Sequence, residues 1–243
     1  KSYIGLVRSN FFDANSVENL VNEWLDESPK NSIALDLGTD MHFATDKLLR
    51  RNGFESDLNS YYLSADDLVQ TTLLLLNGEL LSAVLPEPLL TLSIKNPLFE
   101  GKNATLLSDY SDISIPSKVF LFRQDFIDDF FVSSSGGMKK FYKAWEESVD
   151  ATNDLDNEEI LESSLEIITS TMEGVEGMLK RYKLPEGFSE IFSIPEYSNP
   201  EPLKATDFNQ IKEWAFEKKL IGEKGVDFSF SSIYSDKFKK LYQ

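Results

Sequence analysis

The chain of 243 residues contains no cysteine. Disulfides, thiolate nucleophiles, cysteine-ligated zinc and iron–sulfur clusters are therefore all excluded. Histidine is nearly absent as well, because His42 is the single one. A metal site with two histidines is thus excluded, and at most one imidazole is available as a base.

Basic residues are also scarce. The chain has 24 lysines and arginines against 41 aspartates and glutamates, which gives a net charge of -17. A field of this sign repels phosphate backbones and anionic lipid surfaces. We therefore expect no nucleic-acid partner, although a surplus of carboxylates is also typical of a soluble protein.

The sequence has no uninterrupted apolar run that is long enough to cross a bilayer. Its most apolar zone, residues 68–94, is broken by six residues that are unsuited to hydrocarbon: Asn77, Gly78, Glu79, Pro86, Glu87 and Pro88. This pattern predicts a helix followed by a strand.

Recognisable catalytic motifs are missing too. There is no glycine-rich phosphate loop, dinucleotide fingerprint, zinc spacing or Gly-x-Ser-x-Gly elbow. The acidic run at residues 150–159 lacks the glycine and the terminal glutamate of a calcium loop, so it is typical of a solvated helix start. We expect no catalytic residues, no metal and no cofactor, and hence no enzyme.

What the first half does contain is an alternation of short β-rich runs with helical patterns. The predicted strands are residues 3–7, 32–35, 61–63 and 81–85, and the predicted helices are residues 17–25, 43–51 and 65–76. This order predicts an α/β domain with a largely parallel sheet. Gly53 and Gly78 are suited to end two of the helices, and Ser64 with Asp67 indicates a capping box.

The second half has a different pattern, with predicted helices at residues 137–152, 157–182 and 206–219. An apolar stripe such as Phe141, Ala144, Trp145 and Val149 must be buried against another element. Few strand candidates remain for that purpose. We therefore expect that a segment preceding Lys1 is missing from this chain.

One stretch suited to binding is DLGTDMH at residues 36–42, between a predicted strand and a predicted helix. Gly38 lets the backbone approach a ligand, and the free N–H groups of the helix start attract an anion or a carbonyl oxygen. The alternative is an ordinary turn with Thr39 or Asp40 as the helix N-cap. Asp36, Asp40, His42 and Asp46 do not close a metal ligand set by their spacing.

A second stretch, LPEPL at residues 85–89, ends the strand predicted at 81–85. Ligands bind at the carboxyl edge of open α/β sheets. Pro86 has no N–H with which to continue a ladder, and Pro88 holds Glu87 in an extended conformation. We expect a carboxylate at the mouth of a cleft, where it either faces a solute or braces an opposite lobe.

Taken in order, several segments resemble the second lobe of type II periplasmic solute-binding proteins of ABC transporters, particularly the thiamine-precursor, nitrate and sulfonate group. They are residues 32–42, 65–70, 77–79 and 83–90. Residues 116–126, 141–145, 184–187 and 206–228 resemble the returning segment of the first lobe. The resemblance covers most of the chain, although the opening βαβαβ segment of lobe one is absent.

The resemblance implies a two-lobed α/β fold of periplasmic-binding-protein type II, with sheets flanked by helices and an incomplete first lobe. Residues 1–10 would be a hinge strand and a remnant of lobe one, residues 11–115 would form lobe two, and residues 116–243 would supply the second hinge strand and a helical return segment. The implied ligand-binding residues are Gly38, Thr39, Asp40, Met41, His42, Pro86, Glu87 and Pro88.

The function implied is that of a monomeric, extracytoplasmic, lipid-anchored receptor that closes about a hinge. It would deliver a small solute, such as a thiamine precursor, a sulfonate or nitrate, to an ABC permease. One alternative is an enzyme of the same architecture, of the thiamine-pyrimidine or menaquinone-pathway type. However, the thiamine-pyrimidine enzymes carry a cysteine-rich motif that this chain lacks. A metabolite-sensing domain is the other alternative, and no signalling segment lies within the sequence.

Overall fold

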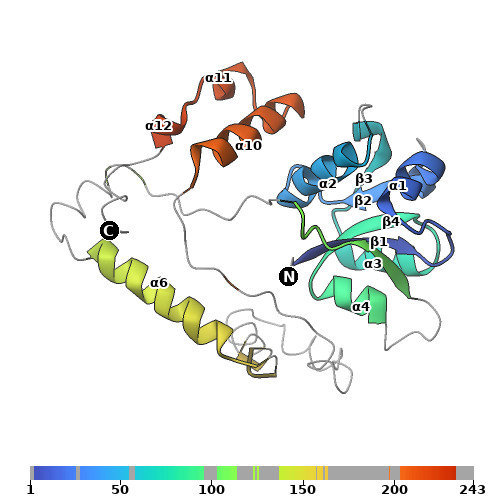
Figure 1. Cartoon of the computed structure of the whole chain (residues 1–243), viewed down its shortest axis with the longest axis horizontal. Helices are drawn as coiled ribbons and strands as arrows, with labels where there is room; N and C mark the ends of the chain where they lie inside the picture. Colours follow the sequence, from blue (N-terminus) through green and yellow to red (C-terminus); the bar gives the residue numbers. More distant parts are fainter. Residues whose placement is uncertain are drawn as a thin grey trace. The chain divides into compact units, whose positions relative to one another are not determined.

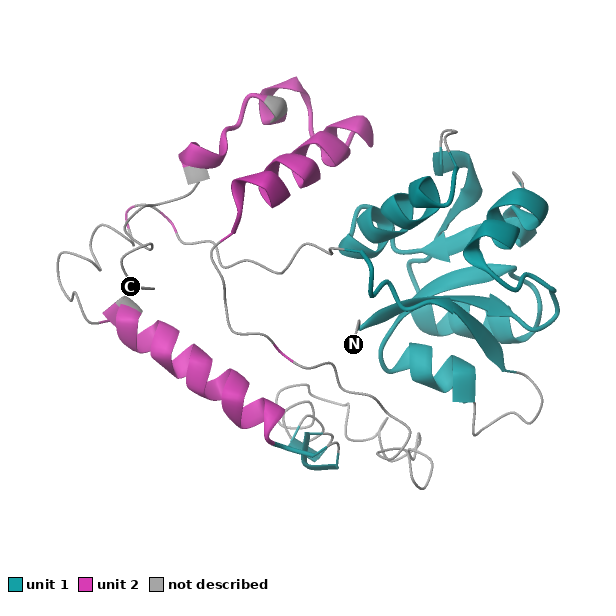
Figure 2. Cartoon of the chain, viewed as in Figure 1, with its two compact units in different colours: residues 1–115, 155–196 teal, residues 116–154, 197–243 magenta. Residues whose placement is uncertain are grey.

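The computed structural model describes six main stretches of the chain: residues 3–25, 28–54, 58–95, 103–113, 137–156 and 203–233. Residues 123, 125, 158–160, 162–163 and 197 are described as well. The chain divides into two compact units (Figure 2). Unit 1 comprises residues 1–115 and 155–196, and unit 2 comprises residues 116–154 and 197–243.

Unit 1 is built on a five-stranded mixed sheet with the order β3-β2-β4-β1-β5 (Figure 1). The strands are β1 (Ile4–Ser9), β2 (Ile33–Leu35), β3 (Tyr62–Ser64), β4 (Ser82–Pro86) and β5 (Ala104–Ser108). Strand β2 runs parallel to both β3 and β4, whereas β1 runs antiparallel to both β4 and β5. Strand β1 therefore runs opposite to the other strands of the sheet. The sequence pattern does not show this direction, because a strand buried on both faces has the same pattern in either direction.

Helices cover both faces of this sheet (Figure 1). One face carries α1 (Val17–Asn19), the π-helix η1 (Leu20–Trp24) and α2 (Asp40–Arg51), and the other carries α3 (Leu68–Leu76) and α4 (Leu89–Lys95). Alternate residues of β4 serve the two faces, since Val84 belongs to the first cluster of buried side chains and Leu85 to the second. Short 3-10 turns lie at η2 (Pro29–Asn31) and η3 (Leu58–Tyr61).

The starts of two helices differ from the sequence prediction. Helix α2 begins at Asp40, three residues before the expected start, and its first turn already buries Met41 and His42. Helix α3 begins at Leu68, since the Asp67 carboxylate accepts the N–H groups of Val69 and Gln70 at 3.0 Å each. The predicted capping box is thus wrong, and the Ser64 hydroxyl donates to Asp66 instead.

Two glycines end helices as expected. Gly53 follows α2 with a φ of 87°, and Gly78 follows α3 with a φ of 75°. Both angles lie in the left-handed region that favours glycine. Helix α4 and strand β5 have no counterpart in the sequence prediction, so the sheet gains an unexpected edge strand.

The described part of unit 2 is helical. It contains α6 (Gly137–Asn153), α10 (Ala205–Glu217), α11 (Glu223–Val226) and α12 (Phe230–Ile233). Helices α6 and α10 confirm the helices predicted at 137–152 and 206–219 to within two residues. The ring centroids of Phe208 and Phe230 lie 5.8 Å apart and join α10 to α12. The predicted helix at 157–182 and the predicted second hinge strand fall largely outside the described residues.

No helix in the described ranges is both long enough and apolar enough to span a membrane. Along α6 the predicted apolar stripe is covered unevenly. Val149 is buried, whereas Phe141 is 42% exposed.

Candidate functional site

The two predicted binding stretches meet at one edge of the sheet. From β2 the chain passes through α2 to β3 on one side, and from β3 it returns through α3, on the opposite face, to β4 on the other side. The carboxyl ends of β2 and β4 are therefore a topological switch point, where open α/β sheets bind ligands. Residues 36–42 follow β2 directly, and residues 86–88 lie at the end of β4.

The turn after β2 is held by its own hydrogen bonds. Gly38 has a φ of 80°, and its N–H donates to Nδ1 of His42 over 3.1 Å. The Thr39 hydroxyl donates to the carbonyl of Asp36 over 2.7 Å. Thr39 occupies the N-cap position of α2 without a capping bond from its side chain. Oδ1 of Asp40 accepts the N–H of Met41 over 3.0 Å, so part of the helix start is already occupied by a carboxylate.

Met41 and His42 lie beneath this turn, since their side chains are only 7% and 4% exposed. Met41 belongs to the core between α2 and the sheet. The His42 ring packs edge-on against Tyr62 with centroids 5.1 Å apart, and its Nε2 lies 3.8 Å from Oδ1 of Asp46. The Tyr62 hydroxyl donates to Asp46 over 2.6 Å. Burial and the neighbouring Asp46 raise the pKa of Tyr62 well above its usual value, so it remains a donor.

Strand β4 continues to Pro86, and the expectation that this proline stops the ladder is wrong. The N–H of Glu87 donates to the carbonyl of Tyr3 over 2.8 Å, and Pro86 lies opposite Ile4. In an antiparallel pair successive N–H groups point to opposite sides. The N–H that Pro86 lacks would therefore point toward β2, whose ladder with β4 pairs only Ser82 and Ala83. Proline thus removes no bond between β4 and β1.

Glu87 is held by the first turn of α4. Its Oε2 accepts the N–H of Thr91 over 3.2 Å, and its Oε1 accepts the Thr91 hydroxyl over 3.0 Å. The Glu87–Pro88 peptide bond is cis. Glu87 is partly exposed, and an ionised carboxylate has about four acceptor positions, so these two bonds orient it without saturating it.

Tyr3 links the two stretches, a role that the sequence pattern does not indicate. Its hydroxyl donates to Oδ2 of Asp40, and its carbonyl accepts the N–H of Glu87. Burial, together with the hydrogen bond to Asp40 and its charge, raises the pKa of Tyr3, so the hydroxyl keeps its proton. In the sequence Tyr3 is an ordinary first residue of a strand. Only the antiparallel register of β1 with β4 brings it to this edge.

The edge is acidic. The segments that follow the four strands of common direction are residues 36–42, 64–67, 86–91 and 108–110, and they contain no lysine or arginine. Their carboxylates belong to Asp36, Asp40, Asp66, Asp67, Glu87 and Asp109. Among the described residues, the ion pairs do not involve Asp36, Asp40 or Glu87. Nor do His, Asp and Glu side chains gather in threes to hold a metal ion in the part of the chain that the structure describes.

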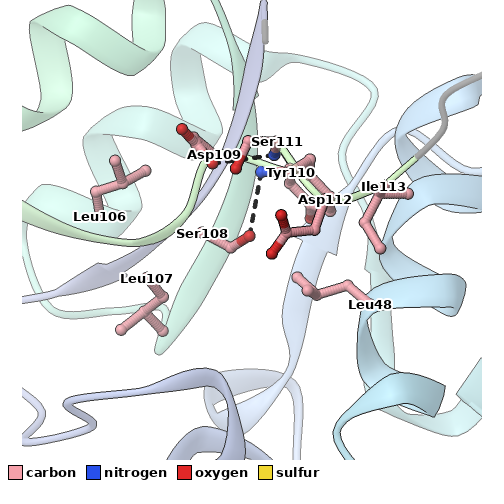
Figure 3. A pocket seen from close by; sticks show the side chains of 9 residues that line it. All are labelled: Leu48, Leu106, Leu107, Ser108, Asp109, Tyr110, Ser111, Asp112 and Ile113. Atoms are coloured by element: carbon pink, nitrogen blue, oxygen red, sulfur yellow. Dashed lines mark hydrogen bonds between the residues drawn. The ribbon is translucent and has the colours of Figure 1, made fainter. Parts of the chain in front are cut away.

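A cavity of about 340 Å³ lies elsewhere, between Leu48 of α2 and residues 106–113 (Figure 3). Its rim is a turn in which Tyr110 takes a φ of 56°. The Asp109 carboxylate accepts hydrogen bonds from Ser111, and these bonds lower its pKa. This cavity follows β5, two strands away from β4, and the predicted site residues do not line it.

No protein-family model matches the chain, and no curated protein matches it in sequence. Among solved structures, the chain is similar to the ligand-binding component of an ABC-type import system from Staphylococcus aureus, which has zinc bound. The TM-score is 0.51 at 9% identity, and the match covers 99% of this chain and 71% of that protein. At this identity the likeness shows the fold alone. The predicted fold class is confirmed: the chain has an α/β fold of the periplasmic-binding-protein type, with a five-stranded sheet flanked by helices.

Proposed function

We propose that this protein is the substrate-binding component of an ABC import system and that it holds a small solute at the ends of β2 and β4. One observation carries the proposal. Residues 36–42 and 86–88, far apart in sequence, meet at the switch point of a fold shared with a ligand-binding component of an ABC-type import system. Such a protein acts outside the cytoplasm, as a monomer that delivers its solute to an ABC permease.

The proposed ligand contacts come from Gly38, Thr39, Asp40 and Glu87. Without a side chain, Gly38 leaves the backbone open to a ligand, and the other three residues offer a hydroxyl and two carboxylates. Met41 and His42 support the turn from below. Pro86 and Pro88 flank Glu87 and restrict its backbone.

The geometry favours binding over catalysis. His42 is the only imidazole, and it is 4% exposed. Its Nδ1 accepts the N–H of Gly38 and is therefore engaged in holding the turn. A general base has to reach a substrate proton, directly or through one water molecule. The arrangement of His42 thus argues against the alternative enzymes of this architecture.

Thermal shift and equilibrium dialysis against pyrimidines, sulfonates, nitrate and flavins test the proposal. A ligand that binds only the folded state stabilises it by about 2.7 kcal/mol at one hundred times its Kd, so the Tm should rise. The thiamine-precursor, sulfonate and nitrate classes are the first solutes to try. Turnover of any of these compounds would refute a pure receptor.

Two variants test the placement of the site. Gly38→Val and Glu87→Ala should each weaken solute binding while the chain still folds. Glu79→Ala is the control, because Glu79 is an exposed carboxylate at the opposite end of β4. Unchanged affinity in both site variants would mean that the solute binds elsewhere on the protein.

A further inference from the structure

The turn before α2 depends on the single histidine of the chain. Gly38 has a left-handed φ of 80°, and its N–H donates to Nδ1 of His42 over 3.1 Å. A ring nitrogen accepts a hydrogen bond only when it carries no proton. A neutral imidazole then keeps its one proton on the other nitrogen, Nε2. In this conformation His42 is therefore neutral, and the backbone of the turn selects its tautomer.

A carboxylate lies at the other nitrogen of the ring. Nε2 is 3.8 Å from Oδ1 of Asp46, which is beyond hydrogen-bond distance but within the range of an ion pair. The same oxygen accepts the hydroxyl of Tyr62 over 2.6 Å. His42 is 4% exposed and Asp46 is 1% exposed, so salt and water screen an attraction between them only weakly.

Protonation of His42 changes both ends of the ring. With a proton, Nδ1 becomes a donor, and two donors then face each other across the 3.1 Å that separates it from the nitrogen of Gly38. That hydrogen bond is lost, while the charged ring is attracted to Asp46. The ring thus has two arrangements: the neutral form holds Gly38, and the charged form is drawn toward Asp46. An imidazole changes its charge between about pH 5 and 8.

Other titratable groups surround the ring. They are Asp46 and Arg50 on α2, Tyr62 on β3, Tyr110 after β5, and Asp36 and Asp40 of the turn. Burial raises the pKa of both tyrosines, so they stay uncharged in this range. The carboxylates favour the charged ring and Arg50 disfavours it. Only His42 has an ordinary titration range near neutral pH among these side chains.

We propose that His42 is a pH-dependent positioning residue: its neutral form holds residues 36–42 in the binding conformation, and its protonation releases the turn and weakens solute binding. The effect on the solute rests on the proposed function, whereas the response of the turn is a property of the chain alone. Because the solute would bind the turn held by neutral His42, affinity is complete above the titration of His42 and falls as pH decreases through it. For one proton the fall is at most about ten-fold per pH unit.

NMR of the full chain tests the response of the turn without any solute. His42 gives the one set of histidine ring signals. Between pH 5.5 and 8, the ring nitrogens should change from the Nε2–H tautomer to the doubly protonated ring as pH falls. The amide signal of Gly38 should change with the same midpoint, whereas that of Gly53, which follows α2, should not. A ring that stays neutral throughout, or a Gly38 amide that does not follow the ring, would overturn the inference.

Two variants separate the acceptor from its titration. His42→Asn places an amide oxygen, which is not protonated in this range, close to the position of Nδ1, so the Gly38 amide should no longer respond to pH. Asp46→Asn removes the charge that attracts the protonated ring, so the ring transition should move to lower pH. The Tm of each variant establishes that it is folded. A Gly38 transition that persists in His42→Asn, or a ring transition that does not move in Asp46→Asn, would contradict the two arrangements.

Calorimetric titration at pH 5.5 and 7.5 tests the effect on binding. The probes are nitrate, methanesulfonate and riboflavin, because none of them changes its own charge in this range. A probe that binds should do so between about three-fold and one-hundred-fold more weakly at pH 5.5, and His42→Asn should remove the difference. Equal affinity at both pH values in the natural chain would overturn the inference and leave the receptor in place.

Failure of the proposed function has a different result. If neither these probes nor the rest of the pyrimidine, sulfonate and flavin panel bind, the proposed function is wrong. The NMR response of Gly38 still decides whether His42 controls the turn.

Discussion

Tyrosine hydroxyls fix the helix that carries half of the candidate site. Tyr3 donates to Asp40, and Tyr62 donates to Asp46, at the first and seventh residues of α2. The Tyr110 hydroxyl lies 2.8 Å from that of Thr45. Each tyrosine comes from a different strand end, so α2 is positioned against three separate parts of the sheet.

Because of Tyr110, the stability of the protein should decrease at alkaline pH. Its burial raises its pKa above the unfolded value near 10, so the folded state holds the proton more tightly. Its contribution to stability is therefore complete below pH 10 and is lost as pH rises further. The free energy of unfolding should fall by up to about 1.4 kcal/mol per pH unit for this one group.

Urea unfolding between pH 9 and 11.5 checks this expectation. Tyr110→Phe should show a shallower decline than the natural chain, and at neutral pH it should cost about 1 kcal/mol for the lost hydrogen bond. Tyr197→Phe is the control, since that ring is 49% exposed. Identical slopes for the natural chain and Tyr110→Phe would contradict the argument.

At the scale of the elements, helix ends depend on single residues. Asp67 caps α3 with one carboxylate oxygen that accepts two N–H groups. Gly53 and Gly78 end α2 and α3 in left-handed conformations. These three residues therefore set where α2 ends and where α3 begins and ends.

A matched pair of substitutions tests the N-terminal cap of α3. Asp67→Ala should lower the free energy of unfolding by about 1 kcal/mol, whereas Asp67→Asn should be nearly neutral, because asparagine caps equally well. Asp66→Ala is the control, because among the described residues that carboxylate accepts only the hydroxyl of Ser64. Urea titration at pH 7 measures all three, and an equal loss in Asp66→Ala would refute the cap.

The two terminating glycines differ in their surroundings, which gives another prediction. A Cβ at Gly53 would meet nothing within 4 Å, so Gly53→Ala carries only the backbone strain of about 1 kcal/mol. A Cβ at Gly78 would lie 2.6 Å from ring atoms of Phe11. Gly78→Ala should therefore be the more destabilising substitution in urea unfolding, and the reverse order would contradict the packing of Phe11.

At the scale of the whole molecule, the packing of the sheet is concentrated in the first half of the chain. In the part of the chain that the structure describes, the five strands and both clusters of buried side chains lie between residues 4 and 113. The described part of unit 2 consists of helices, which make contacts with one another. One such contact is the hydrogen bond from Lys212 Nζ to the carbonyl of Phe228 over 3.1 Å. The assignment of residues 11–115 and 116–243 to two lobes stays a proposal.

This concentration predicts that residues 1–115 fold without the rest of the chain. Because they contain the five strands that the structure describes and the helices that cover both faces of their sheet, the fragment should show mixed α/β circular dichroism and one cooperative urea transition. Size-exclusion chromatography checks that it is a compact monomer. A fragment that lacks a cooperative transition would mean that residues 155–196, the remainder of unit 1, are required for folding.

The sequence predicted element types better than their arrangement. The helices at 137–152 and 206–219 were recognisable because an apolar stripe repeats with the period of a helix. The antiparallel direction of β1 was not, since a strand buried on both faces carries no mark of direction. Helix α4 was missed because Glu87 caps it from just before a proline, where the sequence pattern indicates only an extended turn.

By itself, the sequence determined which catalytic motifs and metal-binding patterns this protein lacks, and that its net charge is negative. It also determined that two turns, one marked by glycine and one by proline, follow strands. Those properties follow from composition and from local conformational preference. Only the tertiary structure decided that the two turns meet and that Tyr3 joins them. The reason is physical: strand order, direction and register depend on contacts between residues far apart in the chain, and local preferences do not encode them.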